Sequence, residues 1–300
     1  MLRVIYVAKV GIFLITVALV AGMAGCSLSP SQNLEIRTWY DLNATRDNLG
    51  GSYILMNNLD STTAGYNELA NSTANQGKGW QPIGTYNNTF TGTFNGQGHK
   101  ISDLFINRPG ETYVGLFGVV GVGGLIENIG VVNAHVIGYA GVSSLTGGNA
   151  GTVSNSYSTG NVTGIGWVGS LVGSNAGTVS NSYSTGGVTG NLSVGGLVGN
   201  NLQGTVSNSY STGGVTGNLS VGGLVGNNTG TVNNSFWDIQ TSGQNTSAGG
   251  TGKTTAGMKN IATFSGAAWN IVTVVNPSTR NPSYIWNIVD NVTYPLLSWQ

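Results

Sequence analysis

The chain has 300 residues, a formal net charge of zero and only 7% charged residues, against about 25% in ordinary globular domains. It contains no basic block that could follow a phosphate backbone, so we expect no nucleic-acid partner. The single cysteine excludes an internal disulfide and any metal site built from several cysteines. The 50 glycines, interspersed with Ser, Thr and Asn, favour many short strands joined by tight turns.

Residues 1–25 have the pattern of a signal peptide. Arg3 and Lys9 supply positive charge, residues 10–20 form an apolar core, and small residues follow it. The alternative is an uncleaved signal anchor, because the apolar stretch is near the lower limit for spanning a bilayer. In either case we expect the rest of the chain outside the cytoplasm.

Cys26 directly follows this segment and is the only cysteine. Met23-Ala24-Gly25-Cys26 resembles the bacterial lipobox, in which the cysteine becomes lipidated and N-terminal after cleavage. The resemblance implies that membrane lipid is a partner through an acylated Cys26. It also implies a place in the cell envelope, at the outer membrane or the cell surface, with residues 26–34 as a linker.

Residues 35–100 are expected to form an N-terminal cap and the first coils of a repeat structure. Thr38 can act as the N-cap of a short helix that has Asp41 in its first turn, and Gly50 and Gly51 can end it. A cap is expected because a bare end would expose unpaired strand edges.

Residues 101–237 repeat with a period of 26 or 27 residues. The tripeptide Asn-Ser-Tyr begins at 155, 181 and 208, and Asn-Ser-Phe begins at 234. Such a period indicates stacked supersecondary units. Three short strands in each unit would correspond to one coil of a parallel β-helix. We therefore predict an all-β fold, a right-handed parallel β-helix (β-solenoid) with 26–27-residue coils and short helical and β caps.

Alignment of the units predicts which side chains face inward. The first apolar position of a unit, such as Ile126 or Val153, is followed two residues later by Asn128 or Asn155. A corner at this Asx position, which adopts the left-handed conformation easily, would turn positions zero, three and five inward. The asparagines of this column are expected to stack as a hydrogen-bonded ladder.

The same alignment places one aromatic residue of each later unit in a stacked row. We predict that this row points outward and offers a binding face; the alternative is that the rings face inward beneath the Val row and fill the core. The row comprises Tyr157, Tyr183, Tyr210 and Phe236.

These units resemble the GLUG repeat, which is named for its Gly-Leu-x-Gly core. That core is present as Gly115-Leu-Phe-Gly118, Gly196-Leu-Val-Gly199 and Gly223-Leu-Val-Gly226. Flanking sequences such as Phe90-Thr-Gly-Thr-Phe-Asn-Gly and Asn234-Ser-Phe-Trp-Asp match the same group of bacterial and archaeal surface proteins. The resemblance implies surface exposure and a solenoid, and little about activity. The repeat also occurs in immunoglobulin A peptidases, outside their catalytic part.

Residues 238–300 are expected to form the C-terminal cap. The stretch from Thr254 to Ala262 favours a second short helix, and apolar residues from Ile285 to Trp299 can cover the end of the solenoid.

Catalytic chemistry is poorly represented. No charged residue lies between Glu127 and Asp238, and His99 and His135 are the only histidines. This pattern predicts no metal site, no cofactor and no nucleotide partner. Three early carboxylates could meet across a groove and hydrolyse a glycosidic bond, but we interpret them as solvated loop acids; they are Asp103, Glu111 and Glu127.

These patterns predict a non-enzymatic, lipid-anchored cell-surface repeat protein. It would act as an adhesin-like binder of a glycan or another surface protein, or as a structural spacer. The alternatives are a polysaccharide-degrading β-helix enzyme and a purely structural envelope protein without a ligand.

Overall fold

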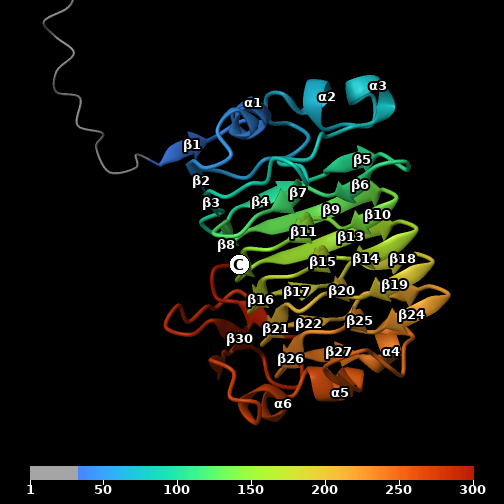
Figure 1. Ribbon diagram of the computed structural model, residues 1–300. Helices are drawn as coiled ribbons and strands as arrows, with labels where there is room; N and C mark the ends of the chain where they lie inside the picture. Colours follow the sequence, from blue (N-terminus) through green and yellow to red (C-terminus); the bar gives the residue numbers. More distant parts are fainter. Residues whose placement is uncertain (1–32) are drawn as a thin grey trace, which may run out of the picture. The chain divides into compact units, whose positions relative to one another are not determined.

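Stacked coils of short parallel strands make up most of the computed structural model, which describes residues 33–300 (Figure 1). The predicted signal peptide 1–25 and the predicted lipidation site Cys26 lie outside the described residues. Within residues 33–300, no helix is long and apolar enough to cross a bilayer.

Each complete coil contributes one stretch of chain to each of four sheets, which we call A, B, C and D. Sheet A contains β1 (Leu34–Ile36), β2 (Ser52–Leu55), β3 (Thr93–Asn95), β8 (Leu125–Glu127), β12 (Thr152–Ser154), β16 (Thr178–Ser180), β21 (Thr205–Ser207) and β26 (Thr231–Asn233). Sheet B contains β4 (Lys100–Ser102), β5 (Phe105–Asn107), β9 (Gly130–Ile137), β13 (Tyr157–Thr163), β17 (Tyr183–Ser184), β18 (Gly187–Thr189), β22 (Tyr210–Ser211), β23 (Val215–Thr216), β27 (Phe236–Asp238) and β28 (Thr251–Lys253).

The other two sheets have five strands each. Sheet C contains β7 (Phe117–Val120), β11 (Thr146–Asn149), β15 (Val172–Asn175), β20 (Val198–Asn201) and β25 (Val225–Asn228). Sheet D contains β6 (Thr112–Val114), β10 (Ala140–Val142), β14 (Gly166–Gly169), β19 (Leu192–Gly195) and β24 (Leu219–Gly222). All strand pairs within these four sheets are parallel, and from β8 to β26 the pairs of sheet A join residues 26 or 27 positions apart, as Val153 joins Val179. The predicted parallel β-helix with 26–27-residue coils is confirmed, with four sheets where three strands per coil were expected.

The corners after sheet A are formed by left-handed residues, as the alignment predicts. Asn128 has φ 54°, and Asn155, Asn181, Asn208 and Asn234 have φ between 46° and 48°. Asparagine tolerates this conformation better than other residues with a Cβ, because its short polar side chain can bond locally. Repeated Asn at this position therefore sets the corner of each coil.

The interior is lined by positions zero, three and five of each unit, which confirms the predicted facing. In the coil that begins with β12 these are Val153, Ser156 and Ser158, all completely buried. The Ser156 hydroxyl donates to the carbonyl oxygen of Ser154 at 2.7 Å, and the Ser156 amide donates to the Ser182 hydroxyl at 3.2 Å. Serine can therefore occupy the core, because its polar atoms are paired.

The asparagine ladder is present, but in a different column from the one predicted. Nδ2 of Asn149 donates to Oδ1 of Asn175 at 2.8 Å, Asn175 donates to Asn201 at 2.8 Å, and Asn201 donates to Asn228 at 2.8 Å. These residues end the strands of sheet C, where side chains in register face one another across coils. The corner column that includes Asn155 is instead tied by backbone bonds, such as its N–H to Ser180. The prediction of a ladder at the corner is therefore wrong.

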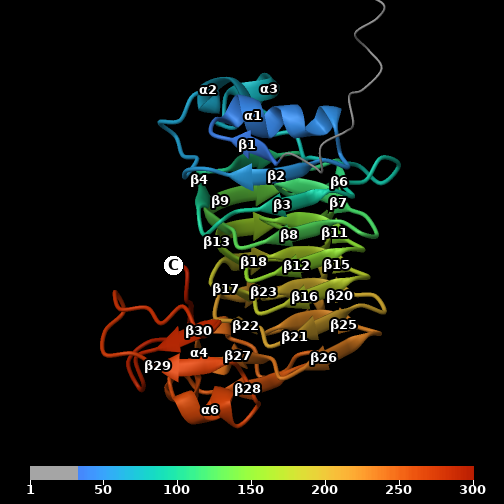
Figure 2. The same ribbon diagram turned by 90° about the vertical axis from the view of Figure 1, so that its left-hand side faces the viewer.

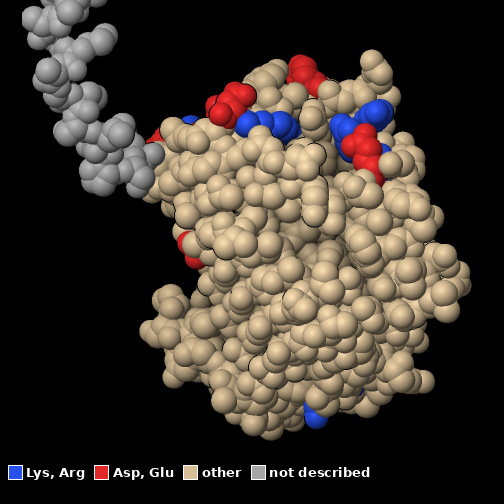
Figure 3. Space-filling model, in the orientation of Figure 1, with Lys and Arg blue, Asp and Glu red and all other residues tan. Residues whose placement is uncertain are grey.

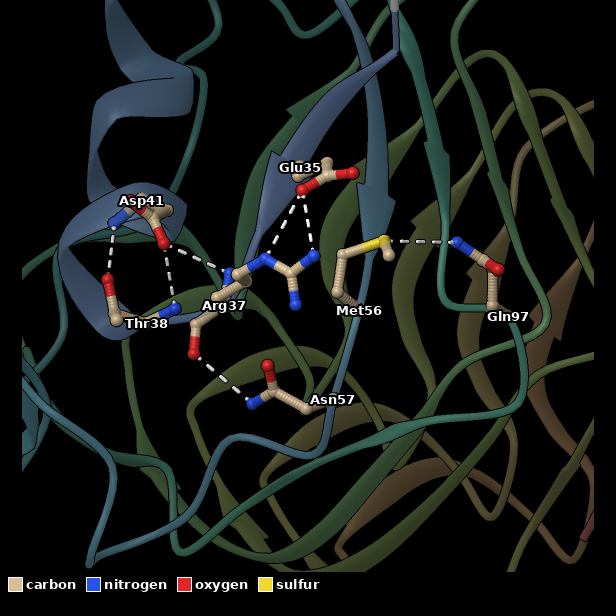
Figure 4. A network of polar contacts seen from close by, with 7 residues as sticks. All are labelled: Glu35, Arg37, Thr38, Asp41, Met56, Asn57 and Gln97. Atoms are coloured by element: carbon tan, nitrogen blue, oxygen red, sulfur yellow. Dashed lines mark hydrogen bonds and ion pairs between the residues drawn. The ribbon is translucent and has the colours of Figure 1, made fainter.

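The N-terminal end is covered by helix α1 (Trp39–Ala44), which continues into the 3₁₀ helix η1 (Thr45–Asp47). As predicted, Thr38 is the N-cap: its hydroxyl accepts from the Asp41 amide, and the Asp41 carboxylate accepts from the Thr38 amide (Figure 4). The Asp41 carboxylate also accepts from the backbone N–H of Arg37, whose side chain pairs with Glu35 at 2.9 Å. The short helices α2 (Tyr66–Leu69) and α3 (Ala74–Gly77) complete the cap.

The C-terminal segment, residues 239–300, lies beside the last coils (Figure 2). It begins with α4 (Ile239–Ser242), and its remaining strands β29 (Ile271–Thr273), β30 (Trp286–Ile288) and β31 (Leu296–Leu297) form a small separate sheet. The predicted helix at 254–262 is two helices, α5 (Thr255–Met258) and α6 (Ile261–Ser265). Asn260 interrupts them because its side chain caps α6 by accepting from the Ala262 amide.

Candidate binding surfaces

The predicted aromatic row exists as a continuous stack on sheet B. The rings of Tyr157 and Tyr183 are nearly parallel, at 4° and 5.0 Å between centroids, and those of Tyr183 and Tyr210 at 2° and 4.9 Å. Phe236 follows in register after Tyr210. The stack has the spacing of adjacent parallel strands, because each ring comes from the same position of successive coils.

The row points away from the interior of the solenoid but is covered by the C-terminal segment. Its four rings belong to a second apolar cluster with Trp269 and Trp286, separate from the cluster that fills the coils. The Tyr210 hydroxyl donates to the carbonyl oxygen of Pro295 at 2.6 Å, and Nε2 of Gln300 donates to the Tyr183 hydroxyl at 2.6 Å. The exposed fraction of each of these four residues is 1–6%.

The expectation of an exposed row is corrected by these contacts. The outward direction agrees with the prediction, but residues 85 and 117 positions further along the chain from Tyr210 and Tyr183 help to shield the rings from solvent. Burial raises the pKa of Tyr210 well above its usual value and also raises that of Tyr183. These hydroxyls are part of a packed interface between the coils and the segment that covers them.

The early carboxylates hold separate structural contacts. Asp103 accepts from the Asn133 amide at 2.7 Å, and Glu127 accepts from the Asn95 amide at 2.9 Å. Glu111 accepts from Nη1 of Arg108 at 3.0 Å. The completely buried Asp238 caps α4 and accepts from the Tyr294 hydroxyl at 2.7 Å. Among residues 33–300 no group of three His, Cys, Asp or Glu side chains could hold a metal ion.

No charged residue lies between Glu127 and Asp238, so the later coils carry no charge. On the face shown in Figure 3, most charged side chains gather over the N-terminal end, an acidic group lies at the left edge of the coils below it, and basic side chains lie at the far end. The surface of these later coils therefore offers backbone, small polar side chains and scattered apolar side chains such as Ile165 and Leu219, with no charged group to attract an ionic ligand.

A hollow of about 280 Å³ lies beside this charged N-terminal end. It is bounded by the turn at residues 81–87, by the turn that carries Arg108 and Glu111, and by the start of β6. We call it the Tyr86–Tyr113 hollow, after the two stacked rings on its wall. The hollow was not predicted from the sequence. The only signal for it is an aromatic residue within a polar turn, Thr85-Tyr-Asn-Asn88. No sequence pattern indicates that this turn meets Arg108, because that contact depends on the stacking of the first coils.

The stacked parallel sheets and 26–27-residue coils define the protein as a parallel β-helix repeat protein. Residues 190–216 match the family model of the GLUG motif. This match covers one complete coil, from the end of β18 to β23, so the GLUG repeat expected from the sequence is present in this chain.

Two curated proteins and one solved structure are similar to parts of the chain. Halomucin of Haloquadratum walsbyi is 37% identical over 114 residues, which cover 38% of this chain and 1% of halomucin. A “Putative Gly-rich membrane protein” of Evansella cellulosilytica is 43% identical over 82 residues, covering 26% of this chain and 10% of that protein. The chain thus matches only a small part of each relative's length.

The solved structure, titled as a putative immunoglobulin A1 protease from Bacteroides ovatus, has 22% identity and a TM-score of 0.56. The likeness covers 70% of this chain and 68% of that one. At this identity the likeness concerns the fold alone.

Proposed function

We propose that this protein is a non-enzymatic, lipid-anchored spacer at the cell surface. The observation that carries the proposal is the burial of the tyrosine row beneath residues 239–300, which leaves the coils after Glu127 with an uncharged surface of small polar side chains and scattered apolar ones. A repeat of this kind extends by about 4.8 Å per coil, so its length is set by the number of coils.

The cell-envelope location rests on two observations. Residues 1–26 have the sequence of a signal peptide followed by a lipidation site. The relative of Evansella cellulosilytica is named a Gly-rich membrane protein, and it shares a quarter of this chain at 43% identity. Both favour a protein held at the envelope by its N-terminus.

The absence of catalytic activity is supported by the described side chains. The three early carboxylates each bind a different neighbour, and Asp238 is a helix cap. A glycosidase needs two free carboxyl groups that flank the bond it cleaves. Each of these four holds a structural contact in residues 33–300, which favours a structural role for them.

Stiffness is supported by the internal ladders. The Asn149–Asn228 ladder crosses four coils inside the solenoid. A buried serine column, in which each amide donates to the hydroxyl of the next coil, also crosses four coils, from Ser156 to Ser235. Paired polar columns of this kind make bending costly, because separating two coils breaks buried hydrogen bonds.

The spacer proposal is tested by antibody access on intact cells. One epitope is inserted after Val275, whose exposed fraction is 85%, and a matched epitope is inserted at the exposed turn after Asn87 near the N-terminal cap. If the N-terminus is the anchored end, the epitope after Val275 is bound more readily. Equal access at both positions, with both proteins folded, would contradict a spacer held at its N-terminal end.

The anchor is tested separately with Cys26→Ala. Cells are supplied with a clickable fatty acid, and label and membrane fraction are compared for the two proteins. The parent chain should carry the label and sediment with membranes, and Cys26→Ala should lose the label. Label that persists in Cys26→Ala would rule out this cysteine as the acylated residue, and would leave the spacer test unaffected.

A further inference from the structure

The Tyr86–Tyr113 hollow is the one open concave surface among those we describe that combines exposed aromatic area with charged side chains. Tyr86 projects from its turn with an exposed fraction of 72%. Its ring stacks on that of Tyr113 with centroids 5.9 Å apart and planes 12° apart. An exposed aromatic ring that is held by a second ring is a preformed apolar platform.

Tyr113 is held in place by the coil next to it. Its backbone is left-handed, with φ 57°, and it pairs in register with Gly141 between the bridges of Thr112 and Val114. A Cβ at Gly141 would lie 2.8 Å from Cδ1 of Tyr113, and one at Gly148 would lie 2.9 Å from the same atom. The two glycines therefore leave space for the Tyr113 ring. The Tyr113 ring in turn supports the stacked ring of Tyr86.

The polar part of the hollow is supplied by a fixed ion pair. Arg108 has an exposed fraction of only 8%; its Nε donates to the carbonyl oxygen of Trp80 at 3.0 Å. Its Nη1 donates to both carboxylate oxygens of Glu111, at 3.0 and 3.2 Å. The two lining charges therefore compensate each other while both keep free hydrogen-bonding capacity. Gln81 and Asn87 add amide groups to the lining.

We propose that the Tyr86–Tyr113 hollow binds an uncharged saccharide chain. A sugar ring has an apolar C–H face, which packs on an aromatic ring, and a rim of hydroxyl groups, which both donate and accept hydrogen bonds. The stacked tyrosines can pack against the apolar face of the sugar. The Arg108–Glu111 pair and the amides of the lining can form hydrogen bonds with its hydroxyl groups. An anionic ligand fits less well because it would compete with Glu111 for Arg108 and for Lys78, which lies 3.6 Å from the same carboxylate.

Trp167 lies outside the hollow, further along the axis of the solenoid. The register of sheet D places Trp167 two coils beyond Tyr113, with Gly141 between them. Two coils correspond to about 10 Å. Trp167 is partly exposed and has the same left-handed backbone as Tyr113. A saccharide chain that leaves the hollow in this direction would therefore meet a second aromatic ring.

The proposal is tested with the full chain, purified in a detergent without a sugar headgroup. It is applied to an array of neutral and uronate-containing oligosaccharides, each as a disaccharide and a hexasaccharide, and affinities for retained members are measured by calorimetry. We expect at least one neutral hexasaccharide to bind, with little dependence on salt concentration. Tyr86→Ala should weaken that binding about tenfold or more, and Tyr86→Phe should keep it, because the ring and not the hydroxyl makes the contact.

The control is Tyr40→Ala, which removes a half-exposed tyrosine from α1 outside the hollow and should leave binding unchanged. Trp167→Ala should lower the affinity for the hexasaccharide more than the affinity for the disaccharide. Tyr86 is exposed, so its loss should not alter the unfolding transition. The proposal would be overturned if the protein bound none of the neutral oligosaccharides on the array. It would also be overturned if Tyr86→Ala and Tyr40→Ala bound the saccharide with equal affinity. Binding restricted to uronate-containing members, with strong salt dependence, would also overturn it.

Discussion

The hydroxyl of Tyr210 donates a buried hydrogen bond of 2.6 Å to the carbonyl oxygen of Pro295, which lies 85 residues further along the chain. This contact joins a repeat coil to the non-repeating C-terminal segment at the last tyrosine of the stacked row. The aromatic row is therefore not a free surface but part of a second apolar core, which it forms with the C-terminal segment.

Tyr210→Phe is expected to lower the free energy of unfolding by about 1–3 kcal/mol, because it leaves the Pro295 carbonyl oxygen buried without that donor. Chemical denaturation measures the change. Tyr40→Phe is the matched control at a half-exposed tyrosine and should change stability by less than about 0.5 kcal/mol. Equal stabilities of the two variants would show that the contact contributes nothing.

Asn175→Ala is expected to cost about 2 kcal/mol or more. Asn175 is completely buried; it accepts from Asn149 and donates to Asn201, so its removal leaves two amide groups each short of a partner. The control is Asn218→Ala, which breaks an exposed asparagine pair with Asn191 and should stay within about 0.5 kcal/mol. Similar costs for both variants would mean that the internal ladder does not stabilise the coils.

Asn181→Val is expected to destabilise the protein by about 1–2 kcal/mol, because a β-branched residue would have to adopt φ 47° at the corner. Asn181→Gly should be much better tolerated, since glycine adopts this conformation without steric cost. Denaturation of both variants tests the corner. The idea fails if valine is accepted as well as glycine.

Stability should fall as the pH rises above about 10, the ordinary tyrosine pKa. Burial raises the folded-state pKa of Tyr183 and Tyr210, and burial with the nearby Asp238 raises that of Tyr294 to about 12. The folded state therefore holds protons that the unfolded state has lost, so the free energy of unfolding decreases through this range and is unaffected below it. Denaturation at several pH values measures the slope. Tyr183→Phe should make the decline shallower, and a free energy that stays constant above pH 10 would contradict the assignment.

Deleting residues 178–204 removes one coil in register, because Thr205 then takes the place of Thr178. The solenoid should still form, but the C-terminal segment would face a row shortened by one ring. Trp299 packs near Tyr157, and Trp269 near Phe236, so both cannot keep their contacts. We expect tryptophan fluorescence to shift to longer wavelength as indole rings become exposed. An unchanged emission spectrum would mean that the segment adapts to the number of coils.

Much of the solenoid could be predicted from repeated residues. The period gave the coil length, and recurrent Asx residues two positions after the apolar residue predicted the left-handed corners found at Asn128 and Asn155. Thr38 and Asp41 predicted the first helix through a local capping pattern. Signals of this kind are reliable because they depend on backbone conformation and on neighbours within one coil.

The candidate surfaces could not be predicted in the same way. Whether Tyr183 is open or covered depends on Gln300, and whether Tyr86 meets an ion pair depends on how the first coils stack. Which asparagine column forms the ladder depends on side-chain direction at the end of sheet C.

The sequence by itself thus determined the coil period, the corners, the inward positions and the cap of the first helix, because each recurs or acts locally. Only the tertiary structure decided that the tyrosine row is buried and that the open aromatic surface is at Tyr86 and Tyr113. The physical reason is that burial is a sum over all neighbours in space, and residues 239–300 carry no repeat that would reveal in advance which coils they cover.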